Sequence, residues 1–206
     1  MNSKILVVID SGHYGYKYNE GVIKGYYESK AMWKLSKYLK QHLTKYGFKV
    51  KMTRSSIYSN PTLQARGNTA YKAKGYKEVV FISNHTNAYS NPNVKGVEVY
   101  RSLHLHGSIE LGKMIVDSIS KLMNTNNRGL KAMLGNNNTD YYGVIKSAVG
   151  GATSEAMANK GNCRYAYLIE YGFHTNKADC EFLSKDANLK TLAKNVATVI
   201  HNYFNK

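Results

Sequence analysis

The sequence has few cysteines, prolines and acidic residues, and it contains no long apolar run. Its two cysteines, Cys163 and Cys180, are too few for a disulfide scaffold and form no C-x-x-C pair, so we expect ordinary thiols. The longest apolar run, residues 5–9, is too short to cross a bilayer. The N-terminus shows neither an extended apolar segment nor a small-residue cleavage site. We therefore expect no membrane span and no signal peptide.

Positive charge and tyrosine are abundant. There are 29 Lys+Arg against 13 Asp+Glu, a formal charge of +16, and 18 tyrosines in 206 residues. The hydrophobic fraction of 43% supports a buried core in one compact domain, so a disordered basic tail is disfavoured. Such a charge first suggests nucleic acid, but the lysines are spread from Lys4 to Lys206 and no nucleic-acid-binding motif is present. The composition predicts an anionic or carbohydrate-like ligand.

Apolar periodicity predicts alternating strands and helices. We expect strands at residues 4–10, 48–53, 78–83, 95–101 and 165–170. Helices are expected at residues 28–46, 62–74 and 108–123, and one or two more within 177–204. Residues 124–164 are rich in Asn, Gly and Ala and receive no assignment. The alternation predicts a single α/β domain over residues 1–206, built on a mostly parallel sheet.

Chemically capable side chains follow the ends of three predicted strands. His13 follows the first strand, His85 follows the central strand, and Glu170 ends the last strand. Glu28 opens the first long helix, whose N-terminus faces the same edge in a βα unit. Because ligands of open α/β sheets bind beyond the carboxyl ends of the strands, we expect these four side chains to converge.

Two imidazoles and a carboxylate form a three-ligand zinc set, which leaves a fourth position for water or substrate. His13, Glu28 and His85 suit the ligand roles. Hydrolysis then needs a carboxylate that is not a ligand and that accepts the proton of the attacking water, and Glu170 suits that role. The sequence therefore predicts a zinc hydrolase with Zn²⁺ as its cofactor.

Short motifs are distributed over nearly the whole chain: IDSGH at 9–13, Glu28, TR at 53–54, Arg66, SNHTN at 83–87, GVEVY at 96–100, RGL at 128–130 and LIEYGFHTN at 168–176. In this order they resemble the zinc-dependent N-acetylmuramoyl-L-alanine amidases of the Amidase_3 type. That family hydrolyses the amide between the lactyl group of N-acetylmuramic acid and the L-alanine of the stem peptide. The resemblance implies zinc on His13, Glu28 and His85, a catalytic Glu170, and peptidoglycan as substrate. With it we expect a mixed, mainly parallel six-stranded sheet flanked by helices.

The chain departs from the family pattern at Ser11, where proline is usual, at Tyr14, where glycine is usual, and at His174, where an aliphatic residue is usual. None of these changes removes a predicted ligand. His174 is interpreted as a loop residue that contacts either a ligand's partner or the substrate. Arg54 and Arg66 either position loops or meet substrate carboxylates.

Plainer interpretations exist for single residues. Glu28 alone would be a carboxylate that favours the helix dipole, which is compatible with the ligand role. Glu170 alone would be a buried partner of a lysine. The pair His104 and His106 is interpreted as solvated surface rather than as a metal site, and Glu155 as a surface residue without a partner.

The predicted biological setting is a phage endolysin, which stays in the host cytoplasm until it is released to the cell wall. The alternatives are a bacterial autolysin, a sporulation or germination amidase in the wall or outside the cell, a different amide hydrolase such as a peptidase, and a noncatalytic basic wall-binding module. Anionic wall polymers are a predicted partner of the diffuse positive charge, and nucleic acid is not. The sequence makes no prediction of the oligomeric state.

Overall fold

The apolar run near the N-terminus forms the buried strand β1 (Ile5–Ser11) in the computed structural model, which describes residues 2–206. β1 pairs in parallel with β2 (Lys49–Met52) on one side and β3 (Glu78–Asn87) on the other. All seven residues of β1 are buried, because both faces of the sheet are covered by helices.

The sheet has six strands in the order β2-β1-β3-β6-β4-β5. β6 (Cys163–Phe173) runs parallel to β3, whereas β4 (Val97–Arg101) is antiparallel to β6, and β5 (Asn127–Lys131) is parallel to β4. The predicted mixed, mainly parallel six-stranded sheet is confirmed. β5 has no expected counterpart in the sequence, because this edge strand is polar and lacks alternating apolar residues.

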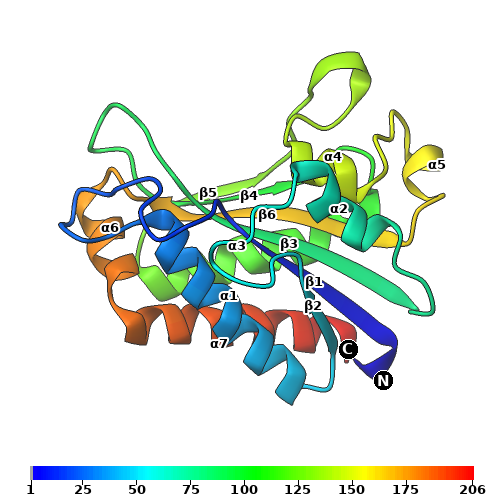
Figure 1. Cartoon of the computed structure of the whole chain (residues 1–206), viewed down its shortest axis with the longest axis horizontal. Helices are drawn as coiled ribbons and strands as arrows, with labels where there is room; N and C mark the ends of the chain where they lie inside the picture. The colour runs from blue at the N-terminus through cyan, green and yellow to red at the C-terminus, as the bar shows by residue number, and fades with distance from the viewer. Residues whose placement is uncertain (1) are drawn as a thin grey trace.

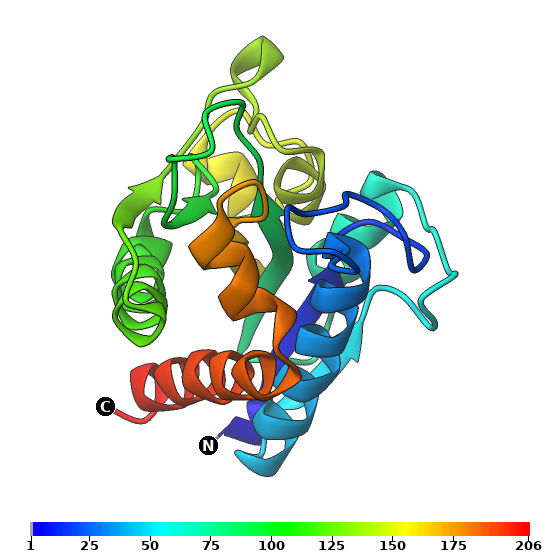
Figure 2. The same cartoon turned by 90° about the vertical axis from the view of Figure 1, so that its left-hand side faces the viewer.

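Helices cover both faces of the sheet (Figures 1 and 2), which makes the chain a single α/β domain. One face carries α1 (Glu28–Lys45), α3 (Ile109–Met123) and α7 (Asp186–Phe204). The other face carries the shorter α2 (Leu63–Tyr71) and α4 (Gly143–Ala148), which pack against each other. The remaining elements are α5 (Glu155–Ala158), α6 (Lys177–Ser184) and the 3-10 turns Asn2–Lys4, His106–Ser108 and Asn136–Asn138. No helix in residues 2–206 has the length and apolarity that a membrane crossing requires.

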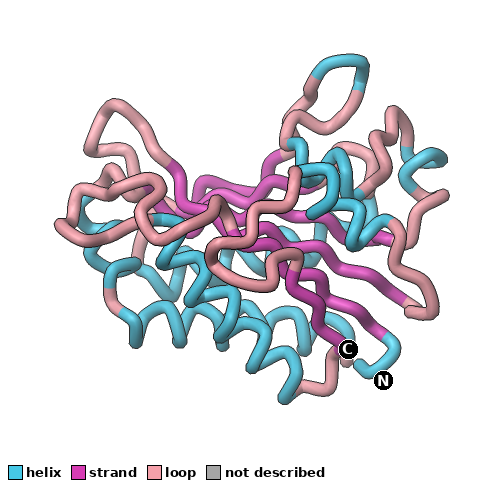
Figure 3. The backbone as a smooth tube through the Cα atoms, viewed as in Figure 1, coloured by secondary structure: helices cyan, strands magenta, loops and turns pink. Residues whose placement is uncertain are grey.

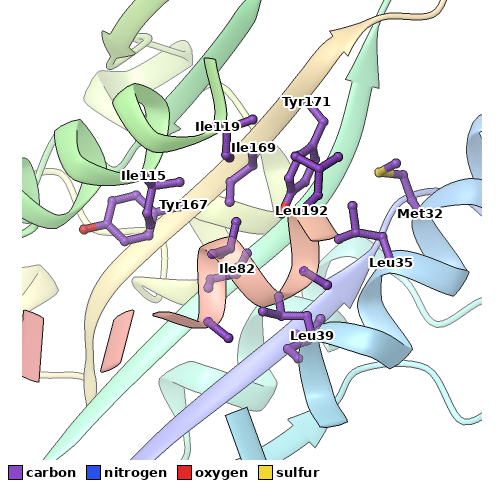
Figure 4. Packing of buried hydrophobic residues seen from close by; sticks show 14 of the residues in the cluster. Met32, Leu35, Leu39, Ile82, Ile115, Ile119, Tyr167, Ile169, Tyr171 and Leu192 are labelled. Atoms are coloured by element: carbon purple, nitrogen blue, oxygen red, sulfur yellow. The ribbon is translucent and has the colours of Figure 1, made fainter. Parts of the chain in front are cut away.

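The larger core lies between the sheet and its three long helices (Figure 4). Met32, Leu35 and Leu39 repeat at helical spacing on α1 and are fully buried in one cluster with Ile82 of β3 and Leu192 of α7. Truncating one such leucine to alanine typically costs about 2–5 kcal/mol. This packing holds α1 rigidly on the sheet and thereby fixes the place of Glu28, its first residue.

The smaller core lies on the face of α2 and α4 and includes Val8, Phe81 and Leu168. Side chains alternate between the two faces of a strand, so residues two or four positions further along these strands lie on the same face. Near the carboxyl ends of the strands these residues are polar. Those side chains are Asp10, His85 and Glu170. The loops after β1 and β3 lie at the same end of the molecule (Figure 3). Cys163 and Cys180 are buried and free, as expected.

Candidate active site

The loop after β1 brings His13 to the sheet edge. The Gly12 N–H donates to the Asn84 carbonyl at 2.9 Å, which ties the loop to the end of β3. A Cβ on Gly12 would lie 2.6 Å from the His85 ring and 2.7 Å from the Asn84 oxygen, so only glycine fits here. His13 itself has a left-handed φ of 46°, and its ring stacks on Tyr18 with centroids 4.6 Å apart. A strained backbone and a stacked ring thus place this imidazole.

Glu28 lies between the two histidines. Its Oε1 lies 3.0 Å from His85 Nδ1 and accepts a 3.0 Å hydrogen bond from the Thr86 N–H. Its Oε2 lies 3.3 Å from His13 Nε2. The three candidate donor atoms of His13, Glu28 and His85 all lie within 4.8 Å of one another. The structure therefore brings together the three side chains that the sequence proposed as ligands.

The electrostatics of this cluster match its geometry. Burial raises the pKa of Glu28, but hydrogen bonds from His13 and His85 and the charges of both rings outweigh it and hold the pKa below its ordinary value. Burial lowers the pKa of His85, and the hydrogen bond and charge of Glu28 reverse the effect and raise it. The carboxylate of Glu28 is thus ionised, as a metal ligand must be.

Asn19 also belongs to this cluster, and the sequence did not reveal it. Its Nδ2 donates to Glu28 Oε2 at 2.7 Å and lies 3.1 Å from His13 Nε2. Its φ of 53° is left-handed, a conformation that asparagine tolerates better than most residues. An asparagine in a glycine- and tyrosine-rich loop gives no signal of such a role in the sequence.

Glu170 lines the same cavity of about 580 Å³ as the three-residue cluster. It is the Cα partner of His85 across β3 and β6, and it is 8% exposed. Its Oε2 has no hydrogen-bond partner among residues 2–206, and no lysine there is among the charges that act on it. Burial raises the pKa of Glu170 to about 8, with the charge of His85 opposing and those of Glu28 and Glu98 adding to the shift. The lysine-partner interpretation is therefore wrong, and the carboxyl group faces an open cavity.

Arg54 and Arg66 position the loop that follows β1. Arg54 Nη1 and Arg66 Nη1 each donate to the Ser11 carbonyl at 3.1 Å, and both side chains are buried. Arg66 Nη1 also lies 3.4 Å from Asp10 Oδ1, and Ser83 Oγ donates to Asp10 Oδ2 at 2.7 Å. Of the two roles open in the sequence, Arg54 takes the loop-positioning role, while Arg66 also lines the cavity.

His174 is buried and connected to the cluster through Thr86. Its Nδ1 lies 3.0 Å from Thr86 Oγ1, while the Thr86 N–H donates to Glu28. Burial lowers the pKa of the His174 imidazole. Of the two contacts expected from the sequence, the contact with a ligand's partner is thus observed; His174 also lines the cavity, and its contact with substrate stays a prediction.

The structure contradicts two predictions, that His104 is solvated and that Glu155 has no partner. His104 is 9% exposed rather than solvated, and its Nε2 lies 2.9 Å from the Asn138 carbonyl oxygen. His106 is at the surface, where it pairs with Glu155 at 3.1 Å, so Glu155 does have a partner. Sequence spacing could not show this, because both contacts come from the unassigned residues 124–164. Within residues 2–206, the candidate metal cluster remains that of His13, Glu28 and His85.

The fold and the site together define an α/β protein with a two-histidine, one-carboxylate cluster at the carboxyl edge of its sheet. The family model for N-acetylmuramoyl-L-alanine amidase, Amidase_3, matches residues 7–202. The chain therefore belongs to the Amidase_3 family and is a peptidoglycan amidase, an N-acetylmuramoyl-L-alanine amidase.

Solved structures agree with this assignment at the level of the fold. An N-acetylmuramoyl-L-alanine amidase from Clostridium difficile 630 is 22% identical with a TM-score of 0.77, covering 98% of this chain and 97% of that one. AmiC2 of Nostoc punctiforme is 23% identical with a TM-score of 0.74, covering 98% of each chain. Cwp6 from Clostridium difficile is 26% identical with a TM-score of 0.76, but the match spans 96% of this chain and only 29% of Cwp6. No curated protein sequence matches the chain.

Proposed function

We propose that this amidase is zinc-dependent, with His13, Glu28 and His85 as the zinc ligands and Glu170 as the general base. The observation that carries the proposal is the convergence of the three donor atoms within 4.8 Å of one another in the lining of the cavity. Two imidazole nitrogens and one carboxylate oxygen are a donor set that zinc uses in catalytic sites, with a fourth position left for water or substrate. The residues present therefore fit the metal.

The orphaned oxygen of Glu170 supports its role. When bound, zinc lowers the pKa of a water ligand to about 7 and polarises the amide carbonyl. Glu170 lies on the neighbouring strand, opposite His85, and within the described residues its Oε2 makes no hydrogen bond that would have to break first. In its ionised form the Glu170 carboxylate accepts the proton of the attacking water, and the resulting carboxylic acid then donates that proton to the nitrogen of the leaving alanine. One carboxyl group thus serves as base and as acid.

Metal removal tests the ligand assignment. Dialysis against EDTA should abolish wall lysis, and equimolar Zn²⁺ should restore it. His85→Ala should bind less than one tenth of the zinc of the wild type in a metal assay, and His106→Ala, at the surface, should bind one equivalent. Full activity of the EDTA-treated protein would refute zinc dependence.

Substitution of Glu170 separates its role from ligation. Glu170→Gln should retain one zinc per chain while its rate falls by a factor of about 10²–10⁴, the usual contribution of general acid–base catalysis. A variant that lyses walls at the wild-type rate would rule out the proposed base. A variant that loses its zinc would show instead that Glu170 is a ligand.

Digested muropeptides identify the bond. Mass spectrometry should find free glycan and intact stem peptides that begin with L-alanine. Cleavage within the stem peptide would favour a peptidase, and the absence of any cleavage with zinc bound would favour the noncatalytic wall-binding module.

The setting that we propose is that of a phage endolysin, released onto the wall from inside the host cell. A bacterial autolysin or a sporulation or germination amidase is the second setting. The charge of +16 supports either one, since it favours retention on anionic wall polymers. Expression inside a bacterium should leave cells intact until a pore-forming membrane protein is induced. Lysis without a pore would contradict the endolysin setting.

A further inference from the structure

A second cavity of about 390 Å³ adjoins the active-site cavity, and two cationic side chains line it. Arg128 and Lys131 line it together with Glu98, whose carboxylate is buried. The two cavities share Asn87 and Ala88 in their linings. They also meet at an aromatic pair, because the rings of Tyr100 and Tyr142, one from each lining, have centroids 4.7 Å apart.

Both cationic side chains are held in place by Glu98 and by aromatic rings. Arg128 donates through Nε to Glu98 Oε1 at 2.5 Å, and Lys131 Nζ donates to the same oxygen at 2.8 Å. The guanidinium lies 5.2 Å over the Phe173 ring, and the ammonium lies 5.8 Å from the Tyr100 ring. The side chains of Arg128 and Lys131 remain 35% and 38% exposed. Each cation is thus oriented by protein contacts and open to the cavity.

The carboxylate of Glu98 does not neutralise both positive charges. Among the described residues that line this cavity, Glu98 is the one acidic side chain beside two cationic ones, so a surplus of one positive charge remains. The two terminal NH₂ groups of Arg128 make no hydrogen bond with any residue in 2–206, since its bond to Glu98 uses Nε. Such a planar pair of donors matches the two oxygens of a carboxylate.

The distance between this cavity and Glu170 sets how far a ligand must extend from the cleaved amide. Glu98 is the Cα partner of Glu170 across β4 and β6, and Lys131 is the Cα partner of Tyr100 on the next strand. Two strand spacings amount to about 10 Å. An extended peptide covers about 3.3–3.6 Å per residue, so a group in this cavity would sit on the second or third residue after the cleaved amide.

We propose that Arg128 and Lys131 form a subsite for a carboxylate of the peptidoglycan stem peptide, on the second or third residue of the leaving chain. The inference rests on the amidase function proposed for the adjoining cavity. It gives the enzyme a preference for stems whose carboxyl groups are free over stems in which they are amidated, because a neutral carboxamide cannot pair with the surplus charge.

Four synthetic substrates test the subsite. Each is an N-acetylmuramoyl tripeptide, L-Ala-γ-D-Glu-L-Lys, with the α-carboxyl of the Glu and the terminal carboxyl each either free or amidated. The wild type should have a KM about tenfold lower for one free carboxylate than for its amide, with kcat unchanged. Arg128→Gln and Lys131→Gln should lose this preference, while Lys131→Arg should keep most of it.

Controls distinguish loss of the subsite from unfolding and from loss of amidase activity. Lys72→Gln, an exposed lysine outside both cavities, should retain the full preference. Circular dichroism spectra and thermal unfolding midpoints close to those of the wild type would show that Arg128→Gln and Lys131→Gln are folded. Equal KM values for free and amidated substrates in the wild type, or a preference that survives in both Gln variants, would overturn the subsite but leave the amidase intact. Failure of the wild type to cleave any of the four would overturn the proposed function itself.

Discussion

Glu170 and Glu98 are neighbouring buried carboxyl groups with opposite environments. Burial dominates at Glu170 and raises its pKa to about 8. At Glu98 burial acts in the same direction, but hydrogen bonds from Lys131, Arg128 and Tyr100 outweigh it and lower the pKa. The two residues face each other across β4 and β6, so the difference arises from side-chain partners rather than from the strand position. The group without a partner is the one poised to exchange a proton.

We expect Glu170→Gln to stabilise the metal-free protein at alkaline pH. A folded-state pKa above the unfolded value favours folding below the unfolded pKa, and that stability is lost as the pH rises through about 8. Glutamine resembles the protonated acid, so in EDTA the variant should gain on the order of 1–3 kcal/mol at pH 9 and almost nothing at pH 4. Thermal unfolding at both pH values measures this. Glu98→Gln is the matched control with the opposite sign, since it should lose stability at neutral pH.

We expect Gly12→Ala to weaken zinc binding, because its Cβ would lie 2.6 Å from the His85 ring and displace it. Isothermal titration with Zn²⁺ should show at least a tenfold loss of affinity, as is usual when a ligand loses its proper orientation. Gly107→Ala, where an added Cβ meets nothing within 4 Å, should bind zinc as the wild type does. An unchanged affinity of Gly12→Ala would show that the loop adapts.

The site is assembled by connections between elements. α1 supplies Glu28 from its first turn, and its apolar face packs the helix onto the sheet together with α7. α2 supplies Arg66, whose guanidinium contacts Asp10 of β1 and the Ser11 carbonyl. Each of these links joins a helix to a strand end, so the loop that carries His13 is braced from two sides.

Arg66→Met should therefore destabilise the fold and loosen the loop after β1. It leaves Asp10 buried beside Ser83 and Thr53 without its cation, and breaking such a pair typically costs about 3–5 kcal/mol. Urea unfolding should show a lower midpoint with an unchanged slope. Lys72→Met, an exposed change just after the same helix, should change the free energy of unfolding by less than about 0.5 kcal/mol and so leave the midpoint nearly unchanged. Equal midpoints for both variants would contradict the bracing role of Arg66.

At the scale of the whole molecule, charge is the dominant feature. The excess of 16 positive charges is carried by lysines and arginines along the entire chain. Several of these side chains pair with acidic residues, as Lys34 does with Asp186 at 3.0 Å, but the few acidic residues leave most of the positive charge uncompensated. A diffuse field of this kind attracts a long polyanion without specific contacts.

Wall binding should weaken steeply as salt is added. Attraction between surface charges is screened beyond the Debye length, which falls from about 10 Å at 0.1 M salt to about 3 Å at 1 M. Co-sedimentation with Gram-positive walls should fall between low salt and half-molar salt, and walls stripped of teichoic polymers should bind less at low salt. Cleavage of a small soluble muropeptide serves as the control and should change much less. Binding that stays constant over this range would exclude the electrostatic mechanism.

The sequence alone predicted the layered α/β class, most helices and strands to within a few residues, and the four residues that meet at the sheet edge. It did so because buried strands and amphipathic helices have distinct apolar periods, and because parallel strands end at a common edge. The strand ends were less accurate. β3 continues through His85 and β6 through Phe173, since both remain paired with their neighbours in the sheet.

Only the tertiary structure decided which polar groups have partners. It revealed β5, whose polar residues gain their place only by pairing with β4, and it placed Asn19 beside His13 and Glu28. It also left Glu170 Oε2 without a hydrogen-bond partner among residues 2–206 and joined Glu98 to Arg128 and Lys131. Apolar burial can be predicted from the sequence because it follows a local period of apolar residues. These hydrogen bonds and ion pairs join residues that are distant in the sequence, so they exist only once the chain has folded.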